Sequence, residues 1–342
     1  MRYSETPRAL GYRMPAEWER HEATWISWPK NPDTFPPPIL PRVEQTFVKM
    51  VDALGEAEEV RVLVDDVKSE TKITSMLKKG GNVTFVRLKT MDVWTRDYLP
   101  TCVRGRDLAL VKWIFNAWGK KYEDLLPDEE AGHRLADSTG LRVFRPEVVL
   151  EGGSIDCDGA GTVLTTEQCL LNSNRNPKMG KGGIEGVLGD YVGAGHVVWL
   201  KNGIEGDDTD GHVDDIARFV GPRSVLAAVE PRRSDPNHGA LQENLTLLAH
   251  ATDSGGRSLN VTEIPMPREV SSNGVRLPAS HLNFYIGNRA VLVPIFGGKS
   301  DRTALEALGE RFPTREVVGI DSRALVYGLG AIHCVTQQVP VI

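Results

Sequence analysis

The sequence has 342 residues, a formal net charge of -6 and 40% hydrophobic residues. This length suffices for one large domain or two average ones with a sizeable core. The acidic balance argues against a dedicated binder of nucleic acid or of anionic membranes, because either would need a basic face. No apolar stretch approaches the roughly 20 residues that span a bilayer, and the N-terminus lacks an apolar signal core. We therefore expect a cytoplasmic protein without membrane association.

Helical spacing of apolar residues predicts helices over residues 44–54, 68–79 and 304–312, the second ending at Gly80 and Gly81. Short apolar, β-branched runs predict strands at 60–64, 83–88, 108–115, 141–144, 148–150, 161–166, 196–200, 217–220, 224–229, 280–285, 290–293, 316–318 and 324–327. Strands that alternate with helices indicate an α/β protein. Similar polar loops follow strands along the chain, so a unit of roughly 50 to 70 residues repeats about five times.

Such units cannot each bury both faces of a sheet, so we expect a closed ring of small sheets with helices outside. The polar loops of all units would then converge on the centre of the ring. This geometry predicts that five polar side chains meet although they are far apart in sequence: Asp97, Glu151, His212, Asp214 and Cys334.

The sequence contains four cysteines: Cys102, Cys157, Cys169 and Cys334. They form no CxxC pair, which argues against a zinc knuckle or a redox dithiol, and cytoplasmic thiols stay reduced. The first three lie in segments typical of strands and are expected to fill space. Cys334 follows a glycine-rich stretch and lies between Ile332 and Val335, as a nucleophile at a strand edge would. The alternative is an inert thiol, since free cysteine is among the most buried residue types.

Each of the other four candidate residues also has an explanation that requires no catalytic role. His212 and Asp214 would face one side of an extended strand, although a solvated loop or a structural contact explains the pair equally. No third ligand stands at a convincing spacing for a metal site. Asp97 follows Arg96, which makes a structural ion pair the simplest reading. Glu151 ends an apolar strand before two glycines that permit a close approach, and an ordinary turn is its alternative.

Together these residues supply a thiol, an imidazole and three carboxylates. Two carboxylates presented to one ligand suit a guanidinium, whose planar donor fork pairs with each acid. A cationic substrate beside Cys334 would also favour the thiolate that a nucleophile needs. The set therefore predicts attack of Cys334 on an amidine-type carbon.

The chain resembles the agmatine deiminase and bacterial peptidylarginine deiminase family of the guanidine-modifying (pentein) superfamily. The resemblance runs from Met14 to the C-terminal cysteine, and its motifs lie at 151–155, 164–177, 199–200, 211–214, 283–285, 316–320 and 332–338. It implies a five-bladed, pseudo-symmetric α/β propeller, with residues 1–342 forming a single catalytic domain of about five ββαβ-type repeats. It also implies hydrolysis of a guanidinium to a ureido group with release of ammonia.

Carried over by motif, Cys334 would be the nucleophile that forms a thiouronium intermediate, and His212 the general acid and base. Asp97 and Asp214 would clamp the guanidinium nitrogens, and Glu151 would orient His212. The resemblance implies a small cationic guanidine substrate and neither a metal nor an organic cofactor. A homo-oligomer is possible.

The agmatine-specific members of the family differ from this chain at several positions beside the motifs. The residues found here instead are Leu99, Asp210, Asp215, Leu329 and Ala331. These departures bear on the tail of the substrate, which is an amine in agmatine, a carboxylate plus an amine in arginine and neither in a peptide. Agmatine is favoured, since an acidic run that includes Asp208 suits a cationic tail, although such runs are usually solvated loops.

Free arginine, peptidylarginine, an amidinotransferase and a non-catalytic guanidinium-binding protein are the alternatives. We expect Trp94 and Trp25 to wall the substrate channel. His333 is expected to be structural rather than catalytic, because neighbouring residues of a strand face opposite ways and Cys334 faces the site.

Overall fold

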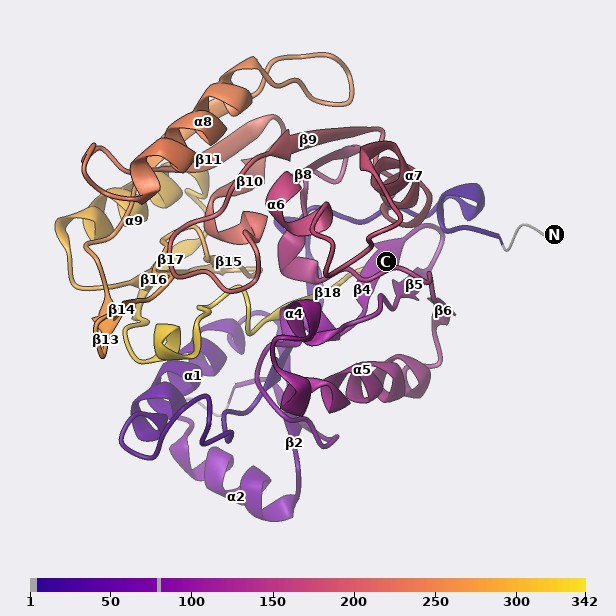
Figure 1. Ribbon diagram of the computed structural model, residues 1–342. Helices are drawn as coiled ribbons and strands as arrows, with labels where there is room; N and C mark the ends of the chain where they lie inside the picture. Colours follow the sequence, from indigo (N-terminus) through magenta and orange to yellow (C-terminus); the bar gives the residue numbers. More distant parts are fainter. Residues whose placement is uncertain (1–4, 79–80) are drawn as a thin grey trace.

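Small mixed sheets with helices toward the outside build the structure (Figure 1). The computed structural model describes residues 5–78 and 81–342. Within these residues, four sheets share one pattern, in which the middle strand pairs antiparallel with the strand before it and parallel with the strand after it. Their strands are β4 (Thr101–Arg104), β5 (Leu108–Val111) and β6 (Arg142–Phe144); β7 (Asp156–Cys157), β8 (Thr162–Thr166) and β9 (His196–Leu200); β10 (Ala217–Gly221), β11 (Ser224–Val229) and β12 (Asn260–Pro265); β15 (Tyr285–Ile286), β16 (Ala290–Ile295) and β17 (Glu316–Asp321).

A fifth sheet joins the two ends of the chain. Its order is β18 (Gln337–Pro340), β1 (His21–Ser27), β2 (Glu59–Val64) and β3 (Val83–Arg87), with β18 antiparallel to β1 and the other pairs parallel. The last strand of the chain is thus anchored on the first. This pairing holds the turn that carries Cys334 beside the N-terminal sheet. A small separate hairpin pairs β13 (Ser271–Ser272) with β14 (Val275–Arg276).

The helices that connect the strands lie mostly at the periphery of Figure 1. They are α1 (Leu40–Leu54), α2 (Val67–Met76), α3 (Thr95–Tyr98), α4 (Ala117–Lys120), α5 (Pro127–Ser138), α6 (Glu167–Leu170), α7 (Lys181–Val192), α8 (Asn237–His250) and α9 (Lys299–Arg311). Short 3-10 turns are η1 (Arg8–Leu10), η2 (Glu123–Leu125), η3 (Gly152–Ser154), η4 (Val213–Asp215) and η5 (Leu325–Gly328). None of the helices in residues 5–78 and 81–342 has the length and apolar character of a membrane-spanning segment.

Local sequence explains several helix boundaries. In α1, the predicted apolar face is buried at Phe47, Met50 and Val51. The carboxylate of Asp66 accepts the backbone N–H of Ser69 at 2.8 Å and so caps the N-terminus of α2. This helix ends at Met76, earlier than predicted, and the expected end at residues 79–80 lies outside the described residues.

Three predicted strands and one strand-like segment have other structures. Residues 148–150 contain only an isolated bridge, between Val149 and Ile114. Residues 325–328 form the 3-10 turn η5, and only the last residue of the 280–285 run, Tyr285, lies in a strand. Cys169 lies in the short helix α6, because the Thr166 hydroxyl accepts its backbone N–H at 3.2 Å and starts a helical turn. The expectation for Cys102 and Cys157 is confirmed, since they lie in β4 and β7.

Candidate active site

Cys334 lies in a turn before β18 and not within a strand. Hydrogen bonds from distant side chains explain the difference from the prediction. The Asn283 Oδ1 atom accepts the backbone N–H groups of His333 at 2.9 Å and Cys334 at 3.3 Å. The Thr336 hydroxyl donates to the carbonyls of Ile332 and His333, each at 3.0 Å. Because side chains occupy these backbone groups, no partner strand can form the usual ladder.

The thiol of Cys334 is buried among polar groups. Asn283 Nδ2 lies 3.2 Å from the sulfur, and Asp214 Oδ2 lies 3.8 Å from it. Burial, followed by the negative charges of Asp214, Asp215 and Asp97, raises the pKa of Cys334 well above its ordinary value. The thiol therefore keeps its proton until a positive charge enters the site.

His212 and Asp214 also differ from the predicted extended strand. Asp210 and Gly211 have φ angles of 66° and 84°, which turns the chain before His212. The Asp207 carboxylate accepts the N–H groups of Gly211 at 2.9 Å and His212 at 3.2 Å, so it holds this loop. The 3-10 turn η4 then carries Asp214.

The imidazole of His212 lies between two carboxylates. Its Nδ1 is 3.9 Å from Asp97 Oδ2, and its Nε2 is 3.8 Å from Glu151 Oε2, distances typical of ion pairs rather than hydrogen bonds. Burial lowers the pKa of His212, but Asp97, Cys169 and Glu151 together raise it well above the ordinary value. The ring is therefore an imidazolium before substrate binds.

Glu151 is anchored from behind by a fully buried arginine. Arg175 Nε donates to Glu151 Oε1 at 2.7 Å, and Arg175 Nη1 also reaches Asp210 at 2.6 Å. Burial raises the pKa of Glu151, but the charge of Arg175 and the neighbouring His212 outweigh it and lower this pKa. Glu151 is thus an ionised carboxylate beside His212, as its predicted orienting role requires.

Asp97 lies on the short helix α3 and accepts two hydrogen bonds. Gly153 N–H donates to Oδ1 at 3.0 Å, and the Trp118 indole donates to Oδ2 at 2.9 Å. Arg96 does not pair with Asp97, which corrects the simplest reading of the sequence. It instead donates to Gln338 at 2.6 Å, on the other side of α3, because neighbouring helix residues point different ways.

The structure brings the predicted residues together around Gly153. A methyl group built on Gly153 would come within 2.6 Å of His212 Nδ1, 3.0 Å of Asp214 Oδ2 and 3.1 Å of Asp97 Oδ1. Only a glycine leaves these three side chains room to meet, which confirms the close approach predicted for the glycines after Glu151.

A cavity of about 230 Å³ opens onto Cys334 and Asp97. The other residues that line it are Asp33, Thr34, Trp94, Trp118, Tyr122, Asp124, Leu125, Asp208, Thr209, Tyr327, Gly328, Leu329 and Gly330. Trp94 and Asp208 therefore lie where the sequence placed them. Trp25 does not line this cavity, because it lies in β1 with the Arg61 guanidinium over its ring.

The model of the Porphyromonas-type peptidyl-arginine deiminase family matches residues 13–340. The chain belongs to this family. A Legionella pneumophila protein provisionally named agmatine deiminase is 38% identical over 99% of this chain and 98% of its own length. The structure of the agmatine deiminase of Enterococcus faecalis is 33% identical with a TM-score of 0.91, covering 99% of this chain and 98% of that chain.

Another deiminase structure is equally close in sequence. A provisionally named arginine deiminase from Porphyromonas gingivalis is 33% identical with a TM-score of 0.88, covering 96% of this chain and 98% of that chain. The resemblance inferred from the motifs is thus confirmed. The sequence identity is the same for the agmatine deiminase and for the arginine deiminase, so it does not distinguish between these two substrates. The residues that line the cavity carry that distinction.

Family motifs contain several residues of the site that sequence reasoning did not single out. Asn283, which contacts the Cys334 sulfur, and Arg175, which anchors Glu151, both lie within motifs that carried the resemblance. Trp118 had no sequence signal, because its role depends on a positive φ of 52° that aims the indole at Asp97.

One group of side chains within the family site is close enough to hold a metal ion. Ligand atoms of Glu151, Cys169 and His212 all lie within 4.8 Å of one another. A metal would have to displace protons from both other ligands, because burial raises the pKa of Cys169 and nearby charges raise the pKa of His212. It would also lie near the Arg175 guanidinium. These residues are therefore poorly suited to a metal and well suited to proton transfer.

Proposed function

We propose that this protein is a deiminase that hydrolyses agmatine to N-carbamoylputrescine and ammonia. The observation that carries the proposal is that Cys334 and Asp97 line one acidic cavity, while His212 and Asp214 pack directly beside them. Membership of a deiminase family and the sequence identity with agmatine deiminases support the same reaction class, a hydrolase acting on amidine C–N bonds.

In the proposed first half-reaction, Asp97 and Asp214 hold the guanidinium, whose positive charge offsets the charges that keep the Cys334 thiol protonated. The thiol releases its proton, and the sulfur forms a bond to the guanidinium carbon. The His212 imidazolium donates a proton to one amino nitrogen, which leaves as ammonia with the electrons of its C–N bond. A cationic thiouronium and a neutral His212 remain.

In the proposed second half-reaction, His212 takes a proton from water, whose oxygen bonds to the same carbon. The C–S bond then breaks, the sulfur keeps its electron pair, and the carbon forms the carbonyl of the ureido product. The free sulfur takes the hydroxyl proton, which restores the thiol, and the ammonia that left earlier takes up the proton that the thiol released in the first half-reaction and becomes ammonium. Every step is a nucleophilic attack or a proton transfer, so the chain's own residues supply the chemistry without a metal or organic cofactor.

The lining of the cavity favours agmatine among guanidine substrates. Three carboxylates line it besides the proposed clamp, at Asp33, Asp124 and Asp208, and no lysine or arginine is among the described residues that line it. Burial and the neighbouring Asp207 raise the pKa of Asp208, although the Tyr122 hydroxyl bond opposes this. An approaching ammonium would favour its ionised form. The carboxylate of free arginine would meet like charges.

The shared strand pattern supports a proposal about architecture. We infer that the five sheets are the blades of an α/β propeller, formed by about five ββαβ repeats of a single catalytic domain. The antiparallel pairing of β18 with β1 supports closure of the ring. This arrangement explains how loops from distant segments reach one cavity.

A panel of guanidines tests the function. Purified protein is incubated with agmatine, arginine and a blocked arginine peptide, and ureido product and ammonia are measured. We expect both products from agmatine, with the largest kcat/KM. Faster turnover of arginine or of the peptide would reassign the substrate. Turnover that requires an added amine and yields a new guanidine without ammonia or ureido product would identify an amidinotransferase. Binding without any turnover would identify a guanidinium-binding protein.

A further inference from the structure

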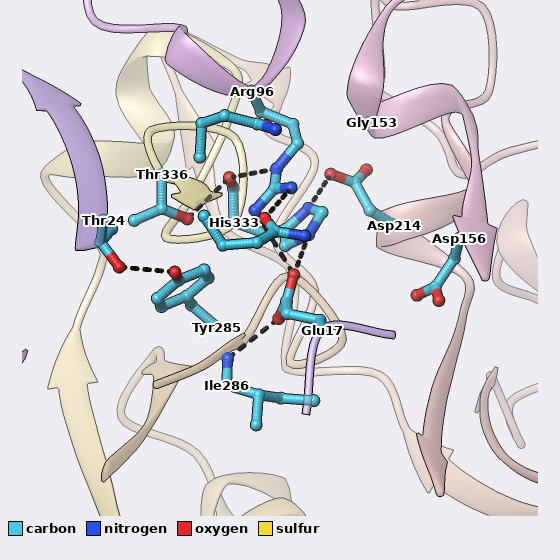
Figure 2. A network of polar contacts seen from close by, with 12 residues as sticks. Glu17, Thr24, Arg96, Gly153, Asp156, Asp214, Tyr285, Ile286, His333 and Thr336 are labelled. Atoms are coloured by element: carbon cyan, nitrogen blue, oxygen red, sulfur yellow. Dashed lines mark hydrogen bonds and ion pairs between the residues drawn. The ribbon is translucent and has the colours of Figure 1, made fainter. Parts of the chain in front are cut away.

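His333 lies between two buried carboxylates, as Figure 2 shows. Its Nδ1 is 2.7 Å from Asp214 Oδ2, and its Nε2 is 2.8 Å from Glu17 Oε2. The expectation that His333 and Cys334 face opposite ways depended on a strand, whereas both lie in a turn. Both side chains therefore approach the same oxygen of Asp214.

Both oxygens that face the ring of His333 belong to buried carboxylates. Burial raises the pKa of Glu17, but Arg218, His333 and Arg96 hold it well below its ordinary value. Burial likewise raises the pKa of Asp214, but the hydrogen bond and charge of His333 lower it. Ionised carboxylates only accept hydrogen bonds. Each ring nitrogen of His333 is therefore placed to donate an N–H to a carboxylate oxygen.

Glu17 is held in place from several directions. Its Oε1 accepts Arg218 Nη2 and the backbone N–H of Ile286, both at 2.9 Å, and its Oε2 lies 3.4 Å from Arg96 Nη2. We call Glu17, Arg96, Asp156, Arg218 and His333 the rear network. Because Glu17 cannot move freely, the His333 ring is fixed at its far nitrogen.

The fixed ring of His333 in turn fixes the carboxylate of Asp214. His333 occupies Oδ2, while Oδ1 has no hydrogen-bond partner among the described residues. A carboxylate fixed through one oxygen can present the other to a donor without losing rotational freedom at that moment.

We propose that His333, supported by Glu17, is a positioning residue that holds Asp214 ionised and oriented for the guanidinium. The proposal rests on the proposed function, because its kinetic effect is on guanidine hydrolysis. His333 does not touch the substrate in this account. It acts through Asp214, which distinguishes it from a residue that only stabilises the fold.

A double-mutant cycle tests whether His333 acts through Asp214. We expect His333→Gln to lower kcat/KM for agmatine by roughly 10²-fold, since displacing one clamping group costs about that much. In an Asp214→Asn background the same change should have almost no further effect. Equal effects in both backgrounds would show that His333 acts independently of Asp214 and would overturn the proposal.

His281 provides a matched control. It is also buried, and its ring contacts the Pro294 carbonyl at 2.9 Å and Ser300 at 3.1 Å, apart from the rear network. His281→Gln should leave kcat/KM within about twofold of wild type, after correction for the folded fraction measured by urea unfolding. If His333→Gln behaves like His281→Gln, the positioning role is wrong.

A neutron structure of the wild-type protein provides a test that needs no variant and no turnover. Deuterium on both ring nitrogens of His333 is expected. One bare nitrogen, or a deuteron on Glu17 or Asp214, would overturn the proposal even if His333→Gln fails to fold. Failure of the wild type to hydrolyse any guanidine would refute the proposed function instead, while the neutron map still decides the state of His333.

Discussion

Two buried polar surfaces meet at Asp214 and differ in how completely their atoms are paired. Toward the cavity lies the substrate face, formed by Asp97, Glu151, His212, Cys334 and the Oδ1 edge of Asp214. Among the described residues, Glu151 Oε2, both ring nitrogens of His212 and Asp214 Oδ1 have no hydrogen-bond partner. In the rear network, both nitrogens of His333 and both oxygens of Glu17 are bonded.

This difference indicates that the two surfaces have different roles. A buried polar atom without a partner costs roughly 1–3 kcal/mol, so the substrate face is destabilising until donors and acceptors arrive with a ligand. Paired charges in the rear network instead fix geometry, and removing one would leave others buried and unpaired. Changes at the substrate face should therefore cost rate, and changes in the rear network should cost stability, with rate lost as well at His333, the member of the network that contacts Asp214.

The largest expected effect is on rate at the substrate face. Cys334→Ala should lower kcat for agmatine by at least roughly 10⁴-fold, because the covalent step is lost. Cys102→Ala is the control, since Cys102 is equally buried but lies in β4. It should keep its kcat. Ureido formation measures the rate and calorimetry measures binding, and retained turnover in Cys334→Ala would refute the covalent mechanism.

The next effect is on stability in the rear network. Arg218 Nη2 donates to Glu17 at 2.9 Å, Nη1 donates to the Phe284 carbonyl at 2.8 Å, and Nε pairs with Asp156. Arg218→Met should lower the free energy of unfolding by about 3–5 kcal/mol, because two carboxylates stay buried without their cation.

Urea unfolding measures the loss, with Arg134→Met as the control. Arg134 pairs with Glu130 on α5 and both side chains are exposed, so its removal should cost less than about 1 kcal/mol. Similar losses in the two variants would remove the distinction between the rear network and ordinary surface pairs.

A third change alters the pH dependence of the substrate face. Glu151 contributes to the raised pKa of His212, so Glu151→Gln should lower that pKa. The alkaline limb of the kcat/KM profile would then move to lower pH, because the acid form of His212 is lost earlier. We also expect kcat to fall by roughly 10²-fold as proton transfer weakens.

The matched control is Glu167→Gln, which removes a surface carboxylate that pairs with Lys181 and Lys201. Its pH profile should superimpose on that of the wild type. An unchanged alkaline limb in Glu151→Gln would exclude Glu151 from the electrostatic support of His212.

A smaller effect concerns the tail of the substrate. Asp208→Asn should raise KM for agmatine by about tenfold, which corresponds to roughly 1.4 kcal/mol, with little change in kcat. KM for ethylguanidine, which has no amine, should not change. Glu205→Gln, an exposed neighbour, serves as the control. A parallel rise in KM for both guanidines would show that Asp208 shapes the cavity and does not bind the amine of the substrate tail.

The smallest effect should come from Asp215, where agmatine-specific relatives are expected to carry asparagine. Burial, Asp214 and Asp207 raise the pKa of Asp215 well above its ordinary value. A carboxyl with a raised pKa in the fold loses its stabilising contribution as the pH rises through that pKa. Asp215→Asn should therefore raise the Tm at about pH 9 and leave it nearly unchanged at about pH 4, where the carboxyl is largely protonated in the fold. Equal shifts at both pH values would contradict this.

Local patterns in the sequence located many of the elements. Apolar spacing located α1, α2, α9 and a middle strand of each of the five sheets, because burial of one face depends on the period of the pattern. It did not locate β1, β12 and β18, or the helices α5, α7 and α8. Motif order also identified the family and the residues that meet at the cavity. Other failures were at the catalytic loops, where η4 and the turn of Cys334 replaced predicted strands. Asn283 holds the backbone of His333 from 50 residues away, and no local pattern reveals so distant a partner. Asp207 holds the other loop from five residues before His212.

The sequence by itself therefore determined which residues are proposed as the nucleophile, the imidazole and the acids, since each residue type carries its own chemistry. Tertiary structure alone decided which charges face the substrate and which support them from behind. The side chain of Arg96 bonds to Gln338 and not to Asp97. His333 connects Asp214 with Glu17, although 316 residues separate His333 from Glu17. Hydrogen bonds of buried groups have to be satisfied wherever the fold brings partners together, and that depends on the packing of the whole chain.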